Sequence, residues 1–541
     1  MRIRSLIVAA VLGLAGWSEA RACTNVLVTK KASKTGFPIV SYTVDGEFHP
    51  SLRFLPAEDH KPGETFDVKG EDGKVRVRIP QPARTWGVIG IMNEHQLTIG
   101  ETTFDGREEL ENKQGGINYW TLMLLGLQRA RTAREAIGVM AGLMDEYGYN
   151  STGESFSIAD KEEAWIMEMI GPGPGGKGAH WAAVRIPDGS VSAHANKARI
   201  GSFPLNDPQN ALYSPDVIAF AEAKGYWNRK SGKPFSFSEA YCPATPQKLR
   251  YTETRVWSMF RRMAPSRTFS PDYHRGVAGA ARYPLWIEAD RKLGVQDVVA
   301  LMRDHYEGTP YDMTVGLDAG PFGSPNRSRP MHFVEGGADY SWERPISTPQ
   351  TANSYVAEVR GDLPDALGGV LWYGVDDTYT SCYFPLYTGI TSSPASYGRW
   401  TIRQFTWDSA FWTFNFVANF ANLRYSSMVK DIRKVQAEME GRFFSAQPAV
   451  EKVALEISKT DPAAARALLT DYCVGAGENV AQRWRQLATE LIARYNDGYV
   501  QDAEGKAKEV GYPEAWLSAV VKARPGQFEL PEGKVVRPES Y

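Results

Sequence analysis

Residues 23–46 read CTNVLVTKKASKTGFPIVSYTVDG, and this stretch decides the fold. Two β-prone runs, Asn25–Thr29 and Pro38–Val44, flank the polar segment KKASKTG. Runs of this composition around a short polar segment predict a β-hairpin. Its first strand would begin beside Cys23, and its turn would bring Asp45 back toward the start of that strand.

The residues before Cys23 have the pattern of a secretory signal peptide. Two arginines precede the apolar run Leu6–Gly16, which is too short to span a membrane. The tripeptide Ala20-Arg21-Ala22 then supplies small residues where a signal peptidase requires them. We therefore expect residues 1–22 to be removed between Ala22 and Cys23, and the mature protein to be secreted or periplasmic.

Two other interpretations of this N-terminus stay open. The first is a buried N-terminal strand or helix, and the second is lipid attachment to Cys23. Arg21 fits lipid attachment poorly, because small residues are required between the apolar position and the cysteine. No later stretch reaches 18 consecutive apolar residues, so no membrane association is expected after removal of the signal.

A cysteine at the start of a mature chain carries two reactive groups on one residue. Its thiol is a nucleophile, and its α-amine, with an ordinary pKa of about 7.7–8.0, can accept the thiol proton. A catalytic histidine is then unnecessary, and the eight histidines form no recognisable catalytic or metal-binding motif. His194 is expected to be a structural histidine. We expect neither a metal nor a cofactor.

Composition narrows the class of protein. The chain has 541 residues, of which 43% are hydrophobic, enough for a large core. A net charge of −2 argues against a nucleic-acid-binding protein, which is usually basic. The other cysteines, Cys242, Cys382 and Cys473, have no zinc-ligand spacing. They allow at most one disulfide, and the alternative is three buried free thiols.

The rest of the pattern predicts sheets covered by helices. Residues 118–146 have the amphipathic periodicity of a helix pair, and beyond residue 404 the composition shifts toward helix-forming residues. Further strands are expected at 86–92, 96–101, 155–159, 164–169 and 181–185, and C-terminal helices at 409–440 and 447–499.

An attacking thiolate produces a tetrahedral oxyanion, which neutral hydrogen-bond donors must stabilise. Asn93 ends the strand-like run WGVIGIMN, and Asn196 ends VSAHAN. Both are candidates for the oxyanion site, and the alternative for each is an ordinary turn asparagine.

Several of these segments together resemble peptidase family C69, the dipeptidase A-like enzymes of the N-terminal-nucleophile hydrolase superfamily. The resemblance follows the order of the chain from Cys23 to about residue 430. It is carried mainly by CTNVLVTKKASKTG (23–36), GVIGIMNEHQLTIGETT (87–103), EYGYNSTGESFSIADKEEAWIMEMIGPG (146–173) and WAAVRIPDGSVSAHANKARIG (181–201).

The resemblance implies an α+β fold. It implies an αββα sandwich of the N-terminal-nucleophile hydrolase type over residues 23–403, with a helical extension over residues 404–541. The implied activity is metal-free hydrolysis of the amide bond of dipeptides or short peptides, which would be the substrates. No nucleic-acid partner is expected, and a homo-oligomer is left open.

Matched by motif, five residues are candidates for catalysis. The resemblance implies that Cys23 is the nucleophile and that Asp45 lies beside its amine. Asn93 and Asn196 match oxyanion or amine-binding groups. Arg255, in the segment YTETRVW, matches a supporting arginine.

Two further positions are candidates for substrate binding. Glu94 belongs to the NEHQL segment, and Tyr42 occupies a position that is arginine in some relatives. Tyrosine cannot supply the charge of arginine, so that role does not transfer. Because the superfamily includes bile-salt and penicillin amidases, hydrolysis of a non-peptide acyl amide is the alternative activity. A non-catalytic binding protein with the same fold is a third interpretation.

Overall fold

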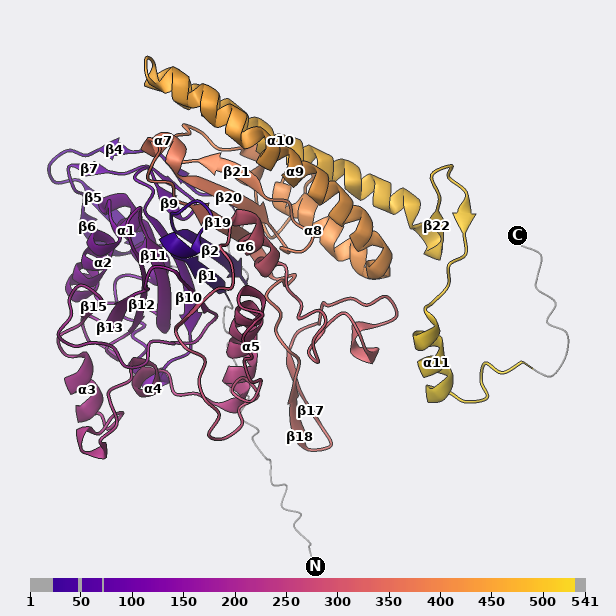
Figure 1. The fold of residues 1–541 in the computed structure, drawn as a ribbon, viewed down its shortest axis with the longest axis horizontal. Helices are drawn as coiled ribbons and strands as arrows, with labels where there is room; N and C mark the ends of the chain where they lie inside the picture. Colours follow the sequence, from indigo (N-terminus) through magenta and orange to yellow (C-terminus); the bar gives the residue numbers. More distant parts are fainter. Residues whose placement is uncertain (1–22, 47–50, 71–72, 531–541) are drawn as a thin grey trace, which may run out of the picture.

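The computed structural model describes residues 23–46, 51–70 and 73–530. It is a mixed α and β structure, in which two large antiparallel sheets lie against each other and helices pack around them (Figure 1). The signal peptide expected over residues 1–22 lies outside the described residues.

The first sheet has seven strands and is built around the predicted hairpin. Thr24 pairs with Thr43 and Val28 with Ile39, so the predicted hairpin is confirmed. This register places Cys23 beside the end of the second strand. Across the sheet the strands are β16 (Trp286–Glu288), β14 (Ser190–His194), β1 (Thr24–Val28), β2 (Ile39–Asp45), β19 (Thr351–Glu358), β20 (Val370–Val375) and β21 (Phe384–Tyr387).

The second sheet has eight strands, and the strands predicted between residues 155 and 185 all belong to it. Across the sheet they are β15 (Ala211–Tyr213), β13 (His180–Arg185), β12 (Ala164–Ile170), β11 (Gly153–Ala159), β10 (Thr98–Phe104), β9 (Met92–Asn93), β8 (Val88–Ile89) and β3 (Phe54–Leu55).

The single strand predicted over residues 86–92 is wrong, because the chain reverses inside it. Ile89 of β8 pairs with Met92 of β9, so Gly90 and Ile91 form a tight turn. Gly90 has φ +56°, and a Cβ at this position would lie 2.6 Å from Leu371 Cδ2. Glycine adopts this backbone conformation without steric cost. An apolar run that looks continuous in the sequence therefore becomes two short strands.

The two sheets pack face to face over a largely apolar interface. Leu27 and Val40 of the first sheet are buried together with Ile166 and Val184 of the second. Gly100 of β10 permits the close approach, since a Cβ there would lie 2.4 Å from Asn25 Nδ2. The start of β1 is thereby held against the middle of β10.

Helices cover the outer face of each sheet. The predicted helix pair is confirmed as α1 (Tyr119–Arg129) and α2 (Ala133–Tyr147), which pack on β10, β11 and β12. Asn118 and Thr132 cap these helices by accepting hydrogen bonds from backbone N–H groups. On the first sheet, α5 (Pro246–Met263) packs on β14, and α6 (Val295–Met302) packs on β2 and β19.

Several short helices and strand pairs lie outside the two large sheets. The remaining helices before residue 400 are α3 (Val217–Ala223), α4 (Phe237–Tyr241) and α7 (Asp365–Gly368). Four two-stranded pairs are β4 (Glu58–Asp59) with β7 (Arg84–Thr85), β5 (Thr65–Lys69) with β6 (Val75–Pro80), β17 (His332–Glu335) with β18 (Ala338–Ser341), and β22 (Val500–Gln501) with β23 (Ala507–Lys508).

The C-terminal helices form as expected, but their break lies elsewhere. They are α8 (Ala410–Ala421), α9 (Tyr425–Ser458), α10 (Pro462–Arg494) and α11 (Glu514–Ala523). The gap expected at 441–446 is helical, and α9 continues through Pro448. The chain turns instead at Asp461, which accepts a hydrogen bond from Ala464 N and precedes Pro462. A capping aspartate followed by proline starts a new helix.

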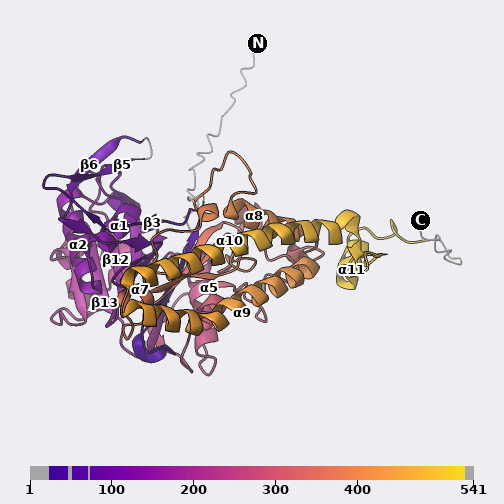
Figure 2. The ribbon, with the colours of Figure 1, turned by 90° about the horizontal axis from the view of Figure 1, so that it is seen from above.

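Helices α9 and α10 run side by side (Figure 2) and pack against β21. Trp484 of α10 stacks on Phe414 of α8 at 4.8 Å between ring centroids. The helical C-terminal portion thus shares the apolar core of the first sheet. Within the described ranges, none of the helices combines the length and the apolar character needed to cross a bilayer.

His194 joins the two sheets, as expected of a structural histidine. Its Nδ1 lies 2.7 Å from Thr102 Oγ1, and its Nε2 lies 3.0 Å from Ser157 Oγ. Burial, and after it the charge of Arg199, lowers the pKa of His194 to about 3. The imidazole is therefore neutral in the folded protein.

This burial predicts a pH-dependent contribution to stability. With an unfolded pKa of about 6.5, only the unfolded state gains a proton on His194 between pH 7 and pH 5, which costs about 2 kcal/mol of folding stability. The stabilising effect is complete above pH 6.5 and is lost as the pH falls. Relative to the parent, His194→Gln should therefore gain about 2 kcal/mol on acidification, measured from melting temperatures at both pH values. If the difference in stability between parent and variant were the same at both pH values, His194 would not be neutral in the folded protein.

Candidate active site

Cys23 lies at the start of β1, where the two sheets meet. Its side chain is completely buried. The thiol Sγ lies 3.5 Å from Glu101 Oε1 of β10 and 4.0 Å from the hydroxyl of Tyr42 on β2. The predicted nucleophile is thus surrounded by groups from both sheets.

The surroundings hold the thiol in its neutral form. Burial, and after it the charges of Glu101 and Asp45, raises the pKa of the Cys23 thiol well above its ordinary value, while the backbone N–H of Asp45 acts in the opposite direction. The thiol is a poor nucleophile in this state, because the thiolate is the reactive form. Its activation requires a proton acceptor close by.

Asp45 ends β2 beside Cys23, as the hairpin predicted. Its carboxylate forms an ion pair with Arg344 and accepts hydrogen bonds from Thr351 Oγ1 at 2.6 Å and Thr43 Oγ1 at 3.1 Å. The Thr43 hydroxyl in turn accepts from the backbone N–H of Thr24 at 3.0 Å. These contacts orient a charged carboxylate toward the first residues of β1.

Arg255 of α5 connects Cys23 to Asn196. Its Nη1 donates to the carbonyl oxygen of Cys23 at 2.7 Å and to Thr24 Oγ1 at 3.0 Å, and its Nη2 donates to Asn196 Oδ1 at 2.9 Å. Burial, and after it the charge of Arg344, lowers the pKa of Arg255 to about 9. That value keeps the guanidinium charged at neutral pH. Two of the predicted site residues are thereby brought to Cys23.

Asn196 has a left-handed backbone conformation, with φ +59°. Its side-chain Nδ2 donates to the carbonyl oxygen of Thr103 on β10 at 2.5 Å. Asparagine tolerates this conformation better than most residues. Asn196 therefore joins the end of β14 to the second sheet, and its Oδ1 accepts from the same guanidinium that binds the Cys23 carbonyl oxygen.

Tyr42 also lies at the site. Its ring is stacked on Tyr355 at 6.0 Å, and its hydroxyl donates a hydrogen bond to Glu101 Oε1. Burial, followed by the neighbouring Cys23, raises the pKa of Tyr42 well above its ordinary value, so the hydroxyl keeps its proton. Tyr42 fixes the position of the Glu101 carboxyl next to the thiol.

Asn93 and Glu94 are placed differently. The Asn93 amide donates to the carbonyl oxygens of Leu127 and Ala130 at 2.7 and 2.8 Å, and its Oδ1 accepts from two backbone N–H groups of its own turn. Glu94 Oε1 accepts from Gly87 N at 3.0 Å. Among the described residues, neither side chain has a hydrogen bond to Cys23. The oxyanion role of Asn93 stays a prediction that this geometry does not support.

Three further residues at the site were not predicted from the sequence. No sequence motif around Arg344 marked it as a site residue. Glu101 belongs to the segment NEHQLTIGETT, where it is an acidic residue inside a strand that is otherwise uncharged. Glu154 of β11 is likewise buried, and its Oε1 accepts from Thr103 Oγ1 at 2.8 Å. For both glutamates, the available signal was an acidic residue in a strand that carries no other charge, since such a side chain is rarely buried without a specific reason.

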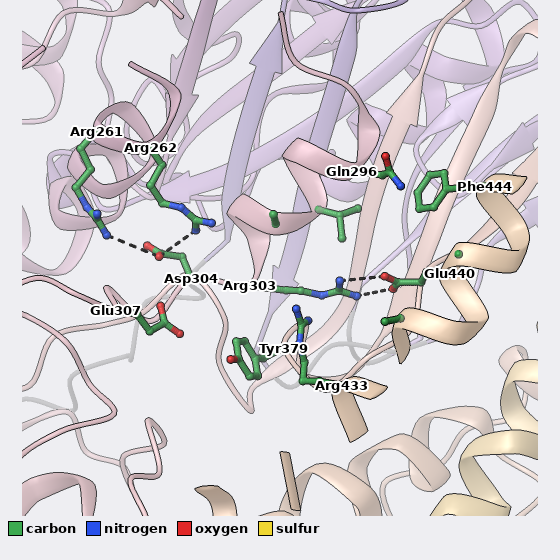
Figure 3. Close-up of a pocket in the computed structure, with 14 residues that line it drawn as sticks. Arg261, Arg262, Gln296, Arg303, Asp304, Glu307, Tyr379, Arg433, Glu440 and Phe444 are labelled. Carbon is green, nitrogen blue, oxygen red and sulfur yellow. Dashed lines mark hydrogen bonds and ion pairs between the residues drawn. The ribbon is translucent and has the colours of Figure 1, made fainter. Parts of the chain in front are cut away.

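A large cleft lies elsewhere, between α9 and the segment around α6. Its volume is about 610 Å³, and Arg303 and Glu440 form a bidentate ion pair inside it, with distances of 2.5 and 3.1 Å (Figure 3). Arg262 points at Asp304 from the other wall. The predicted site residues do not line this cleft. Within the described part of the chain, no cluster of three or more side chains could hold a metal ion.

Sequence comparisons identify relatives over most of the chain. A probable dipeptidase of Salmonella dublin is 26% identical over 70% of this chain and 83% of its own length. A probable dipeptidase of Latilactobacillus sakei is 24% identical over 88% of this chain and 95% of its own length. Dipeptidase A of Lactobacillus helveticus is 23% identical, with coverages of 88% and 96%.

The family match covers both large sheets. The model of peptidase family C69 matches residues 22–438, which include both large sheets, their covering helices and the surroundings of Cys23. The chain therefore belongs to peptidase family C69.

Proposed function

We propose that this protein is an exported cysteine dipeptidase, in which removal of residues 1–22 makes Cys23 the first residue. The observation that carries the proposal is the convergence of Asp45, Asn196 and Arg255 on Cys23, in a family whose relatives are named dipeptidases. The proposed substrates are dipeptides or short peptides, cleaved without a metal.

The proposed architecture is the αββα sandwich of N-terminal-nucleophile hydrolases. Two stacked sheets lie between the α1–α2 layer and the α5–α6 layer, and the first strand of the mature chain is central in its sheet. This arrangement supports the assignment, because it buries the start of β1 between elements that can carry catalytic groups. The helical C-terminal portion adds to the first sheet from outside.

In the proposed mechanism, the α-amine of the mature Cys23 takes the thiol proton. The thiolate attacks the carbonyl carbon of the scissile amide, and an S–C bond forms while the carbonyl becomes an oxyanion. The amine then gives its proton to the leaving nitrogen, and the C–N bond breaks. Water attacks the resulting thioester, releases the carboxylic acid and restores the thiol. Asp45 stabilises the protonated amine electrostatically, and Arg255 holds the Cys23 main chain in place.

The first prediction concerns the free amine. A chain that begins at Cys23 should be active, whereas a chain with one additional alanine before Cys23 should lose roughly 10²–10⁴-fold in kcat, because an amide nitrogen cannot accept the proton. Intact mass establishes the N-terminus of each preparation, and release of amino acids from a dipeptide measures kcat. Equal activity of the two chains would exclude the amine as the base.

The second prediction concerns the nucleophile. Cys23→Ala should abolish dipeptide hydrolysis, and Cys23→Ser should keep a small residual rate, because the amine base survives and only the nucleophile weakens. Cys242→Ala is the matched control, since Cys242 is also a buried free cysteine but lies outside the site. Circular dichroism verifies folding. Substantial turnover by folded Cys23→Ala would rule out this role.

The third prediction concerns Asp45. A nearby carboxylate raises the pKa of both amine and thiol, so Asp45→Asn should lower kcat and move both limbs of the pH–rate profile to lower pH. Loss of the buried ion pair with Arg344 should also cost about 3–5 kcal/mol of stability. Thr351→Val is the control, because it removes a hydrogen bond to Asp45 but keeps the charge. An unchanged profile in folded Asp45→Asn would separate Asp45 from the amine.

A further inference from the structure

The Glu101 carboxyl is an unusual neighbour for a nucleophile. It is completely buried, and in the described residues no lysine, arginine or histidine forms an ion pair with it. Oε1 accepts the Tyr42 hydroxyl and lies 3.5 Å from Cys23 Sγ. Among the described residues, Oε2 has no hydrogen-bond partner unless a protonated Glu154 donates to this carboxyl. Burying a carboxylate whose oxygens lack hydrogen-bond donors costs folding free energy, unless a ligand supplies those donors.

Glu154 makes the acidic character of this region stronger. Its Oε2 accepts from the Tyr149 hydroxyl at 3.4 Å, and the two glutamate carboxyls are close enough to share a hydrogen bond when one is protonated. Burial, and after it the charge of Glu101, raises the pKa of Glu154 well above its ordinary value. Because each carboxylate opposes the ionisation of the other, the pair favours a state with one shared proton and one negative charge.

The distance to Sγ restricts what can bind there. In the first residue of a peptide, the α-nitrogen is two bonds from the carbonyl carbon, about 2.5 Å away. For attack, that carbon must lie about 3–3.5 Å from Sγ. An α-ammonium group is therefore carried to within a few ångströms of the thiol, which is the region that the Glu101 carboxyl occupies.

We propose that Glu101 binds the free α-ammonium group of the substrate's first residue, so that cleavage requires an unblocked N-terminus. This inference rests on the proposed dipeptidase function and adds a specificity-determining residue to it. The ammonium hydrogens satisfy both carboxyl oxygens, and the new cation compensates the buried charge. Tyr42 is the positioning residue, because its hydroxyl holds Glu101 in place.

Two other roles for Glu101 make different predictions. It could accept the Cys23 thiol proton directly, or it could bind the α-amine of Cys23 itself. In both cases its loss would slow the reaction of Cys23 with every substrate and with alkylating reagents. In the proposed role, only substrates with a free amine are affected.

The test compares Ala-Ala with N-acetyl-Ala-Ala in the mature enzyme. Parent enzyme should strongly prefer Ala-Ala. Glu101→Gln should lower kcat/KM for Ala-Ala roughly 10- to 100-fold, the usual effect of a charge-assisted hydrogen bond, mainly through KM. The already low kcat/KM for N-acetyl-Ala-Ala should not fall, so the ratio of the two kcat/KM values should decrease strongly. Alkylation of Cys23 by iodoacetamide should keep its parental rate.

Two more variants sharpen the result. Tyr42→Phe keeps the ring and removes the hydroxyl that donates to Glu101 and lies 4.0 Å from Cys23 Sγ. It should weaken the same preference to a smaller extent, and it serves if Glu101→Gln does not fold. Glu358→Gln is the control, because Glu358 is a buried glutamate that pairs with Ile39, at the opposite end of β2 from Asp45. It should leave the preference unchanged.

Other outcomes overturn the inference in distinguishable ways. A parallel loss with both peptides, together with slow alkylation in Glu101→Gln, would assign Glu101 to activation of Cys23. Equal cleavage of both peptides by the parent would show that no ammonium is recognised. If the parent alkylates at Cys23 but cleaves neither peptide, the proposed dipeptidase function fails, and this inference fails with it.

Discussion

The structure depends on the buried guanidinium of Arg255, which binds the carbonyl oxygen of Cys23 and the side chain of Asn196 at once. A buried cation is tolerated only where acceptors surround it, and here they come from the starts and ends of neighbouring strands. The same contact secures α5 against the first sheet. It also fixes the main chain of Cys23, so the direction of the thiol follows from the position of one helix.

Charge is divided between two sides of Cys23. On one side, Asp45 is paired with Arg344 and lies near Arg255, so its carboxylate is neutralised and oriented. On the other side, Glu101 and Glu154 form an acidic pair without a cation in the described structure. The thiol between them is neutral, because burial and both carboxylates oppose its ionisation. In the proposed mechanism, such a site keeps the Cys23 thiol unreactive until a base and a substrate are both present.

Local patterns predicted several elements but not which polar residues meet. The hairpin, the helix pair α1–α2 and strands β11 to β13 follow from alternation, helical periodicity and capping residues. Asn93 and Glu101 belong to one motif, yet the sequence predicted a catalytic role for Asn93 and not for Glu101. The Asn93 side chain makes four hydrogen bonds to backbone groups of its own turn and of the end of α1, whereas Glu101 lies beside Cys23. The difference depends on where β10 crosses β1, which no local pattern contains.

The sequence alone therefore determined the first hairpin, the helix pair, the family and the identity of Cys23, Asp45 and Arg255 as candidates, because these follow from local patterns and short motifs. Only the tertiary structure decided the partners. Arg344 reaches Asp45 across 299 positions of the chain, and Glu101 reaches Cys23 across 78. Contacts of this kind arise from the stacking of two sheets, and the free energy of burying their charges is settled only when both sheets are in place.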